Sequence, residues 1–86
     1  MNKMAEQLTE LEGIIASLNE ILDDQGVPKN VRSKIQSTIL SLKEEVERPI
    51  RINRALNILD ELSNDSNLQS YTRAQIWNVM SVLEKI

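Results

Sequence analysis

Three arginines form the most distinctive charged pattern of the chain: Arg48, Arg51 and Arg54 follow one another at steps of three residues. On an α-helix this spacing keeps the three side chains within about 120° of the surface, in a single stripe. A guanidinium group binds phosphate and carboxylate groups through two parallel hydrogen bonds. The stripe therefore predicts an anion-binding patch, either for RNA or for an acidic partner protein, unless acids of the chain itself satisfy it.

Such acids stand immediately before the stripe, at Glu44, Glu45 and Glu47. Acidic residues at the end of one helix and basic residues at the start of the next each oppose the helix dipole. The acidic side chains at one helix end can form ion pairs with the basic side chains at the next helix start, across the joint. We favour this local ion-pair network over the anion-binding patch, and exposed pairs of this kind contribute only about 0–1 kcal/mol each.

Trp77 is the one tryptophan, and Arg73 precedes it by four residues, on the same face of a helix. A large aromatic side chain usually fills a core, which is the interpretation that we favour. Trp77 also lies one position away from an inward-facing Ile76, so the alternative is a half-exposed tryptophan at the rim, with Arg73 stacked on its ring. A tryptophan in that setting is typical of an interface anchor.

The composition excludes several kinds of chemistry. The chain has no Cys and no His, which excludes zinc fingers, haem ligands, cysteine nucleophiles and Ser–His pairs. Its two glycines, Gly13 and Gly26, are too few and too far apart for a phosphate-binding loop. Asp65, Asn67 and Gln69 resemble the start of a calcium loop, but the sixth and twelfth positions lack the required Gly and Glu. We therefore expect no metal and no cofactor. We also expect no enzymatic activity, since no carboxylate sits alone on an apolar stripe, where burial would raise its pKa.

The chain of 86 residues predicts a single domain, residues 1–86, with a net charge of −3 and a pI near 4.9. The acidic balance and the presence of one Trp and one Tyr argue against general nucleic-acid binding. No apolar run approaches the roughly 18 residues of a membrane span. The first residues also lack the basic and apolar regions of a signal peptide. These features predict a soluble cytoplasmic protein.

Apolar residues recur at helical spacing in four segments and predict an all-α fold. The first segment runs from Met4 to Leu22 at alternating steps of four and three, with Gly26 suited to a left-handed closing position. The second follows Pro28 and stops near Glu47, and the third begins at Pro49. The fourth runs from about residue 70, with Ala74, Ile76, Trp77, Val79, Met80, Leu83 and Ile86 inward. Short joints predict an antiparallel up-and-down four-helix bundle.

The two halves of the chain align when one is shifted by 41 residues. The shift superposes Asp24 on Asp65 and Arg32 on Arg73, together with the apolar positions that flank them. Each half is then a helical hairpin whose joint carries an Asp that could cap the next helix and be reached by the Arg of that helix. A period near 40 is typical of HEAT-type units. Two units fall short of a solenoid, so we expect the hairpins to close on each other.

Four stretches resemble a small archaeal family of uncharacterised single-domain proteins. They are Val27-Pro28-Lys29-Asn30-Val31-Arg32, Arg54-Ala55, the run from Leu59 to Asn67 containing Asn64-Asp65, and Arg73-x-x-Ile76-Trp77. The resemblance covers nearly the whole chain and implies a four-helix fold in an archaeal, cytoplasmic setting. The family pattern usually has prolines in the joint before the fourth helix, and this chain has Ser66 and Gln69 there. The family implies no activity, so no site residue is carried over from it.

These observations favour a non-enzymatic protein–protein interaction module that binds through a helical surface. The candidate interaction surface consists of Arg48, Arg51, Arg54, Arg73 and Trp77. The alternative is an RNA- or ribonucleoprotein-associated accessory protein that uses the three arginines at the start of the third helix. A monomer and a homodimer both remain open. The homodimer would use apolar side chains left outside the core (Ile14, Ile21, Ile58 or Val82) or the serines at 33, 37 and 41.

Overall fold

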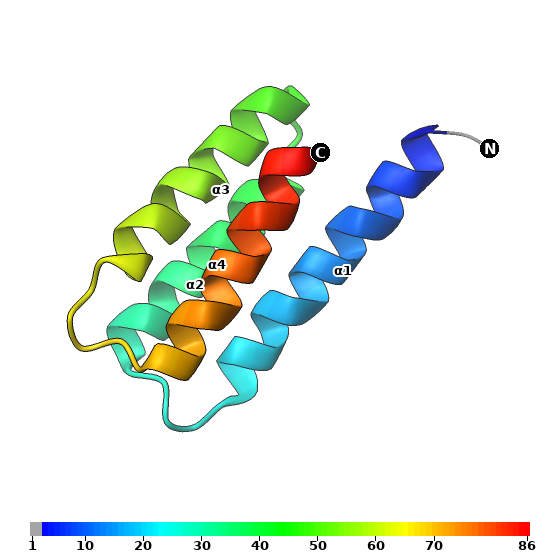
Figure 1. The fold of residues 1–86 in the computed structure, drawn as a ribbon. Helices are drawn as coiled ribbons and strands as arrows, with labels where there is room; N and C mark the ends of the chain where they lie inside the picture. Colours follow the sequence, from blue (N-terminus) through cyan, green and yellow to red (C-terminus); the bar gives the residue numbers. More distant parts are fainter. Residues whose placement is uncertain (1–2) are drawn as a thin grey trace.

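The computed structural model describes the backbone of residues 3–86 and the side chains of residues 10–86. Four α-helices make up this part of the chain, and it contains no strand: α1 (Lys3–Asp23), α2 (Lys29–Lys43), α3 (Arg48–Ser63) and α4 (Ser70–Lys85). Figure 1 shows them in chain order from blue to red. The all-α prediction is confirmed. The predicted Met4 and Leu8 contacts lie outside the described side chains.

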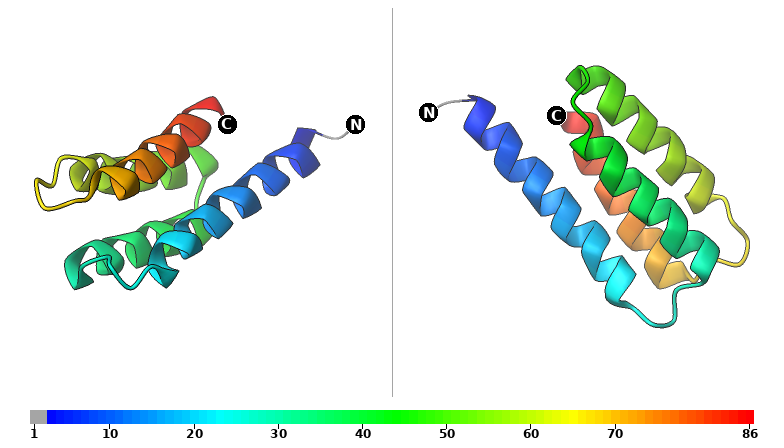
Figure 2. Two further views of the ribbon diagram at one scale, coloured as in Figure 1. Left: turned by 60° about the horizontal axis from the view of Figure 1, so that its bottom comes forward. Right: turned by 180° about the vertical axis from the view of Figure 1, so that it is seen from behind.

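The helices form a ring of antiparallel neighbours. α1 packs against α2 and α4, and α3 packs against α2 and α4, so each hairpin contacts the other. The N-terminal part of α1 diverges from the other three helices, as both views of Figure 2 show. One end of the molecule therefore carries the splayed start of α1 beside the joint between α2 and α3.

One apolar cluster fills the space between the helices. Leu18, Ile35, Leu59 and Leu83, one from each helix, are fully buried in it, as the helical spacing predicts. On α1 the inward stripe differs from the predicted one, because Ile14, Leu18 and Ile21 are buried while three neighbours are only half-buried. These three are Leu11, Ile15 and Leu22. Val27 and Leu68, one in each hairpin joint, are also buried and cover the end of the core at these joints.

Three sequence-based details were wrong. α2 ends at Lys43, before the predicted Glu47, because the chain turns to extended geometry at Glu44. Gly26 is not in the left-handed region, since no described residue has a positive φ. The joint closes instead through the Asp24 carboxylate, whose Oδ1 accepts a hydrogen bond from the Gly26 N–H at 2.9 Å. On α4, Ala74 is exposed and Thr72 takes an inward position.

The two hairpin joints make matching hydrogen bonds at a shift of 41 residues. Arg32 donates from Nη1 to the Leu22 carbonyl (2.6 Å) and from Nη2 to the Asp24 carbonyl (3.0 Å). Arg73 donates from Nε to the Ser63 carbonyl (3.0 Å) and from Nη2 to the Asp65 carbonyl (2.8 Å). The predicted return of each Arg to its Asp is therefore found, although it reaches the backbone and not the carboxylate.

Helix capping by these aspartates was predicted and is wrong. Pro28 and Gln69 stand at the N-caps of α2 and α4, and neither helix has a side-chain cap hydrogen bond. The Asp65 Oδ1 accepts from the Asn67 N–H at 2.9 Å, as Asp24 does from Gly26, so each carboxylate closes its own turn. The relation of these hairpins to HEAT repeats stays a prediction.

Candidate interaction surface

The arginine stripe begins α3, where Pro49 occupies the first turn without losing a helical hydrogen bond. Arg54 Nη1 lies 2.6 Å from Glu44 Oε2 and forms an ion pair across the α2–α3 joint. Arg48 and Arg51 are half-buried. The structure thus engages Arg54 in the local ion pairing that the charge pattern favours. Arg48 lines the groove described next.

A groove of about 320 Å³ runs between the start of α3 and the end of α4. Its lining is mostly apolar, with a guanidinium at one side and a carboxylate at the other. The lining residues are Arg48, Pro49, Ile52, Asn53 and Leu56 of α3, and Leu83, Glu84 and Ile86 at the end of the chain. An apolar surface with two opposite charges at its border is suited to contact with another polypeptide.

Trp77 extends this surface along α4. It lies seven residues before Glu84, two helical turns away on the same stripe, and 57% of its surface is exposed. The expectation that Trp77 fills the core was wrong. Ile76 occupies the inward position and is fully buried, and the next residue points about 100° away from it. The seven-residue spacing to Glu84 was the signal that could have placed Trp77 outside.

The Arg73 side chain is bound to the backbone of its own molecule and does not extend into solvent as a cation for partners. Its Nε and Nη2 donate to backbone carbonyls at the α3–α4 joint, so its guanidinium group is directed toward the loop. The candidate residues are therefore distributed over three places. Arg73 lies at the α3–α4 joint, Arg51 and Arg54 lie near the α2–α3 joint, and Arg48 and Trp77 border the face formed by α3 and α4.

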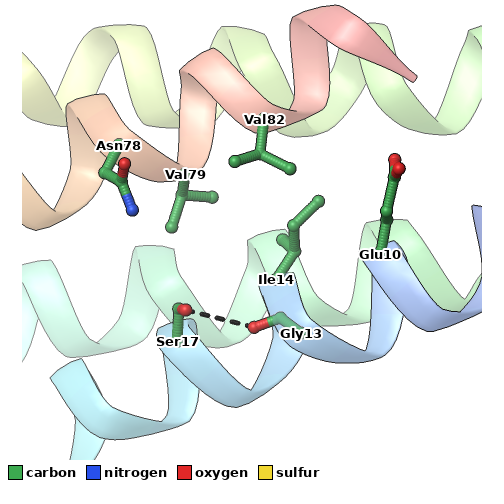
Figure 3. Close-up of a pocket in the computed structure, with 7 residues that line it drawn as sticks. All are labelled: Glu10, Gly13, Ile14, Ser17, Asn78, Val79 and Val82. Atoms are coloured by element: carbon green, nitrogen blue, oxygen red, sulfur yellow. Dashed lines mark hydrogen bonds between the residues drawn. The ribbon is translucent and has the colours of Figure 1, made fainter.

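A second, smaller cleft of about 190 Å³ separates α1 from α4. Figure 3 shows Ile14 of α1 facing Val79 and Val82 of α4 across it, with Glu10 at one end and Asn78 at the other. Within this lining Glu10 is the one ionisable side chain. Gly13 and Ser17 complete the α1 side, and the Ser17 hydroxyl donates back to the Gly13 carbonyl at 3.1 Å. The cleft offers an apolar contact surface with a single carboxylate.

A third groove, of about 350 Å³, lies between α1 and α2. Leu22 and Ile39 line its apolar part, with Asn19 and Gln36 beside them. Leu40 borders the groove, and 66% of its surface is exposed. Sequence reasoning did not single out this leucine because its neighbour Ile39 satisfies the helical spacing.

Two classes of site are absent from the part of the chain that the structure describes. No three Asp or Glu side chains gather closely enough there to hold a metal ion. None of the described helices combines the length and the apolar character that crossing a membrane requires.

Comparison with known proteins gives one consistent result. A model described as "Uncharacterised protein family (UPF0147)" matches residues 1–86. The chain is 42% identical to a UPF0147 protein of Methanocaldococcus jannaschii, over 88% of this chain and 83% of that protein. It is 33% identical to one of Sulfurisphaera tokodaii, over 100% of this chain and 98% of that protein.

Two solved structures share the fold. The protein of unknown function MMP1188 is 38% identical, with a TM-score of 0.84 over 90% of this chain and 89% of that chain. A protein of the same uncharacterised family from Thermoplasma acidophilum is 32% identical, with a TM-score of 0.84 over 91% of this chain and 93% of that chain. The names of these relatives state no activity, so the functional proposal rests on the geometry of this chain.

Proposed function

Because the chain belongs to the uncharacterised UPF0147 family, its function has to be inferred from its surface, and we propose a non-enzymatic module of the archaeal cytoplasm that binds a protein partner. The proposed contact is the α3–α4 face, defined here as Trp77 together with the groove lined by Arg48, Leu56 and Glu84.

The exposure of Trp77 is the observation that carries this proposal. An indole ring in water costs free energy that its burial against a partner recovers, and tryptophan is enriched among residues that dominate binding energy. The groove on the same face supplies an apolar surface, and Arg48 and Glu84 at its border supply orientation. A non-enzymatic role is consistent with the small number of ionisable groups in the grooves described above.

The test is capture of partners from native lysate by the tagged chain, with and without nuclease. Tyr71 is the matched control, because it is also an exposed aromatic residue of α4, with 69% of its surface exposed. We expect a protein that survives nuclease, is lost with Trp77→Asp and is retained with Tyr71→Asp. Equal capture by the wild type and Trp77→Asp would remove the α3–α4 face from consideration.

An RNA- or ribonucleoprotein-associated role is the second candidate, and the basic middle of the chain favours it. Residues 28–54 contain seven basic and three acidic residues. In this case the captured partners disappear with nuclease, and affinity for single-stranded RNA falls steeply with salt. Replacing Arg51 and Arg54 by Glu would abolish such binding, whereas Trp77→Asp would leave it nearly unchanged. The two candidates therefore predict opposite outcomes for the same variants.

A further inference from the structure

The groove between α1 and α2 lies between two helices whose described charged side chains are of opposite sign. On α1, the charged residues between positions 10 and 23 are all acidic: Glu10, Glu12, Glu20 and Asp23. Glu10 lines the cleft between α1 and α4, on the other side of the helix. On α2, the four charged residues are all basic: Lys29, Arg32, Lys34 and Lys43. Lys34 pairs with Glu61 of α3 at 3.3 Å, and Arg32 donates to carbonyls of the α1–α2 joint. Two helices of opposite charge therefore lie side by side, with the exposed Leu40 and the apolar groove between them.

Two of these charges flank the groove directly. Glu12 lies seven residues before the groove residue Asn19, so it shares the same stripe of α1. Lys43 lies seven residues after the groove residue Gln36, on the matching stripe of α2. Both side chains are exposed.

The two side chains also stand at the same level of the molecule. α1 and α2 are antiparallel, and the Leu22 carbonyl accepts from Arg32 while Asn19 and Gln36 line one groove. Asn19 and Gln36 therefore lie at one level. Because the helices are antiparallel, the residue seven positions before Asn19 lies level with the residue seven positions after Gln36. Glu12 and Lys43 thus lie on opposite sides of the groove, level with the end of α2. The start of α1 diverges from the bundle toward this same end (Figures 1 and 2).

We propose that this face joins two copies of the chain in a symmetric dimer whose two-fold axis runs parallel to the helices. This operation places α1 of each copy opposite α2 of the other at the same level, so Glu12 of each copy faces Lys43 of its partner. The Leu40 side chains then come to the middle of the interface, against the apolar groove formed by Leu22 and Ile39.

A second copy fits this face because the face is complementary to itself. A two-fold contact uses the same surface on both partners, so it needs opposite charges arranged symmetrically about one line. Glu12 of α1 and Lys43 of α2 meet that requirement. The other face-to-face arrangement would place α1 against α1 and bring like charges together, which is unfavourable. Burial of Leu40 supplies the apolar contribution.

The first test is sedimentation equilibrium of the full chain over a range of concentrations. We expect a dimer whose dissociation constant rises by at least about tenfold with Leu40→Glu, since a buried unpaired carboxylate is costly. Ile50→Glu is the control, because Ile50 is an exposed residue of α3 (42%) and lies outside the proposed interface. A wild-type chain that stays monomeric at every concentration, or a dimer that Leu40→Glu leaves intact, would overturn the proposal.

A charge exchange then tests the orientation of the two copies. Glu12→Lys alone and Lys43→Glu alone should each weaken the dimer, because each places like charges opposite one another. The double variant Glu12→Lys with Lys43→Glu should restore the wild-type dissociation constant. A double variant weaker than either single variant would reject the parallel two-fold axis. Circular dichroism confirms that each variant is folded, so a change in mass reports on association.

Discussion

Arg32 and Arg73 are equivalent residues, 41 positions apart, and each joins the end of one helix to the start of the next by two hydrogen bonds to backbone carbonyls. The last carbonyls of a helix have no partner within that helix, and here a side chain of the next helix donates to them. In both hairpins this donor is an Arg in the first turn of the second helix. The shared contact explains why the sequence repeat centres on the joints.

Removing either guanidinium group should destabilise the fold. Arg73→Ala leaves the Ser63 and Asp65 carbonyls without that donor, and hydrogen bonds to charged groups contribute about 1.5–3 kcal/mol. We expect a loss of that order in the free energy of unfolding, measured with urea. Arg73→Lys should rescue little of it, because an ammonium group cannot reproduce the two-donor geometry. Lys29→Ala, an exposed change at the start of α2, is the control, and an equal loss there would contradict the assignment.

Substitution of Gly13 should raise the stability of the fold. This glycine lies inside α1, and a Cβ added to it would meet nothing within 4 Å. Gly13→Ala should therefore stabilise the chain by up to about 1 kcal/mol, which is the difference in helix propensity. At Gly26, by contrast, a Cβ would lie 3.3 Å from Asp24 Oδ1 in the turn. Gly26→Ala should give no comparable gain, and thermal unfolding of both variants provides the comparison.

The fold could be predicted from the sequence because four apolar stripes at helical spacing allow little else. The centre of each stripe was harder to locate. On α1 the doublets Ile14-Ile15 and Ile21-Leu22 fit two neighbouring stripes equally well, and only packing between α2 and α4 selects the one through Ile14 and Ile21. The same ambiguity placed Trp77 inside, next to Ile76. Surface residues such as Leu40 carry no periodic signal, so the grooves could not be predicted.

This selection predicts unequal costs for two neighbouring truncations on α1. Leu18 is fully buried in the core cluster, so Leu18→Ala should cost about 2–5 kcal/mol in the free energy of unfolding. Ile15 is only half-buried at the edge of the same cluster, and Ile15→Ala should cost clearly less. Chemical denaturation of the two variants measures the difference. Equal losses would mean that the stripe through Ile15 shares the centre of the core.

The ion pair between Arg54 and Glu44 should contribute little, despite its 2.6 Å separation. Both side chains are about half exposed, and water and salt screen such pairs. A double-mutant cycle with Arg54→Ala and Glu44→Ala should give a coupling free energy below about 1 kcal/mol that decreases as salt is added. A larger, salt-independent coupling would show that the α2–α3 joint depends on this pair for its geometry.

Trp77 reports directly on the proposed contact, because it is the only tryptophan of the chain. With 57% of its surface exposed, its emission in the free protein should lie toward that of an indole in water, and iodide should quench it. Dimerisation through α1 and α2 should leave this emission unchanged, since Trp77 is on α4. Binding of a partner at the α3–α4 face should shift it to the blue and protect it from quenching. A blue-shifted emission from the free monomer would place the indole in the core and remove the basis of the proposed function.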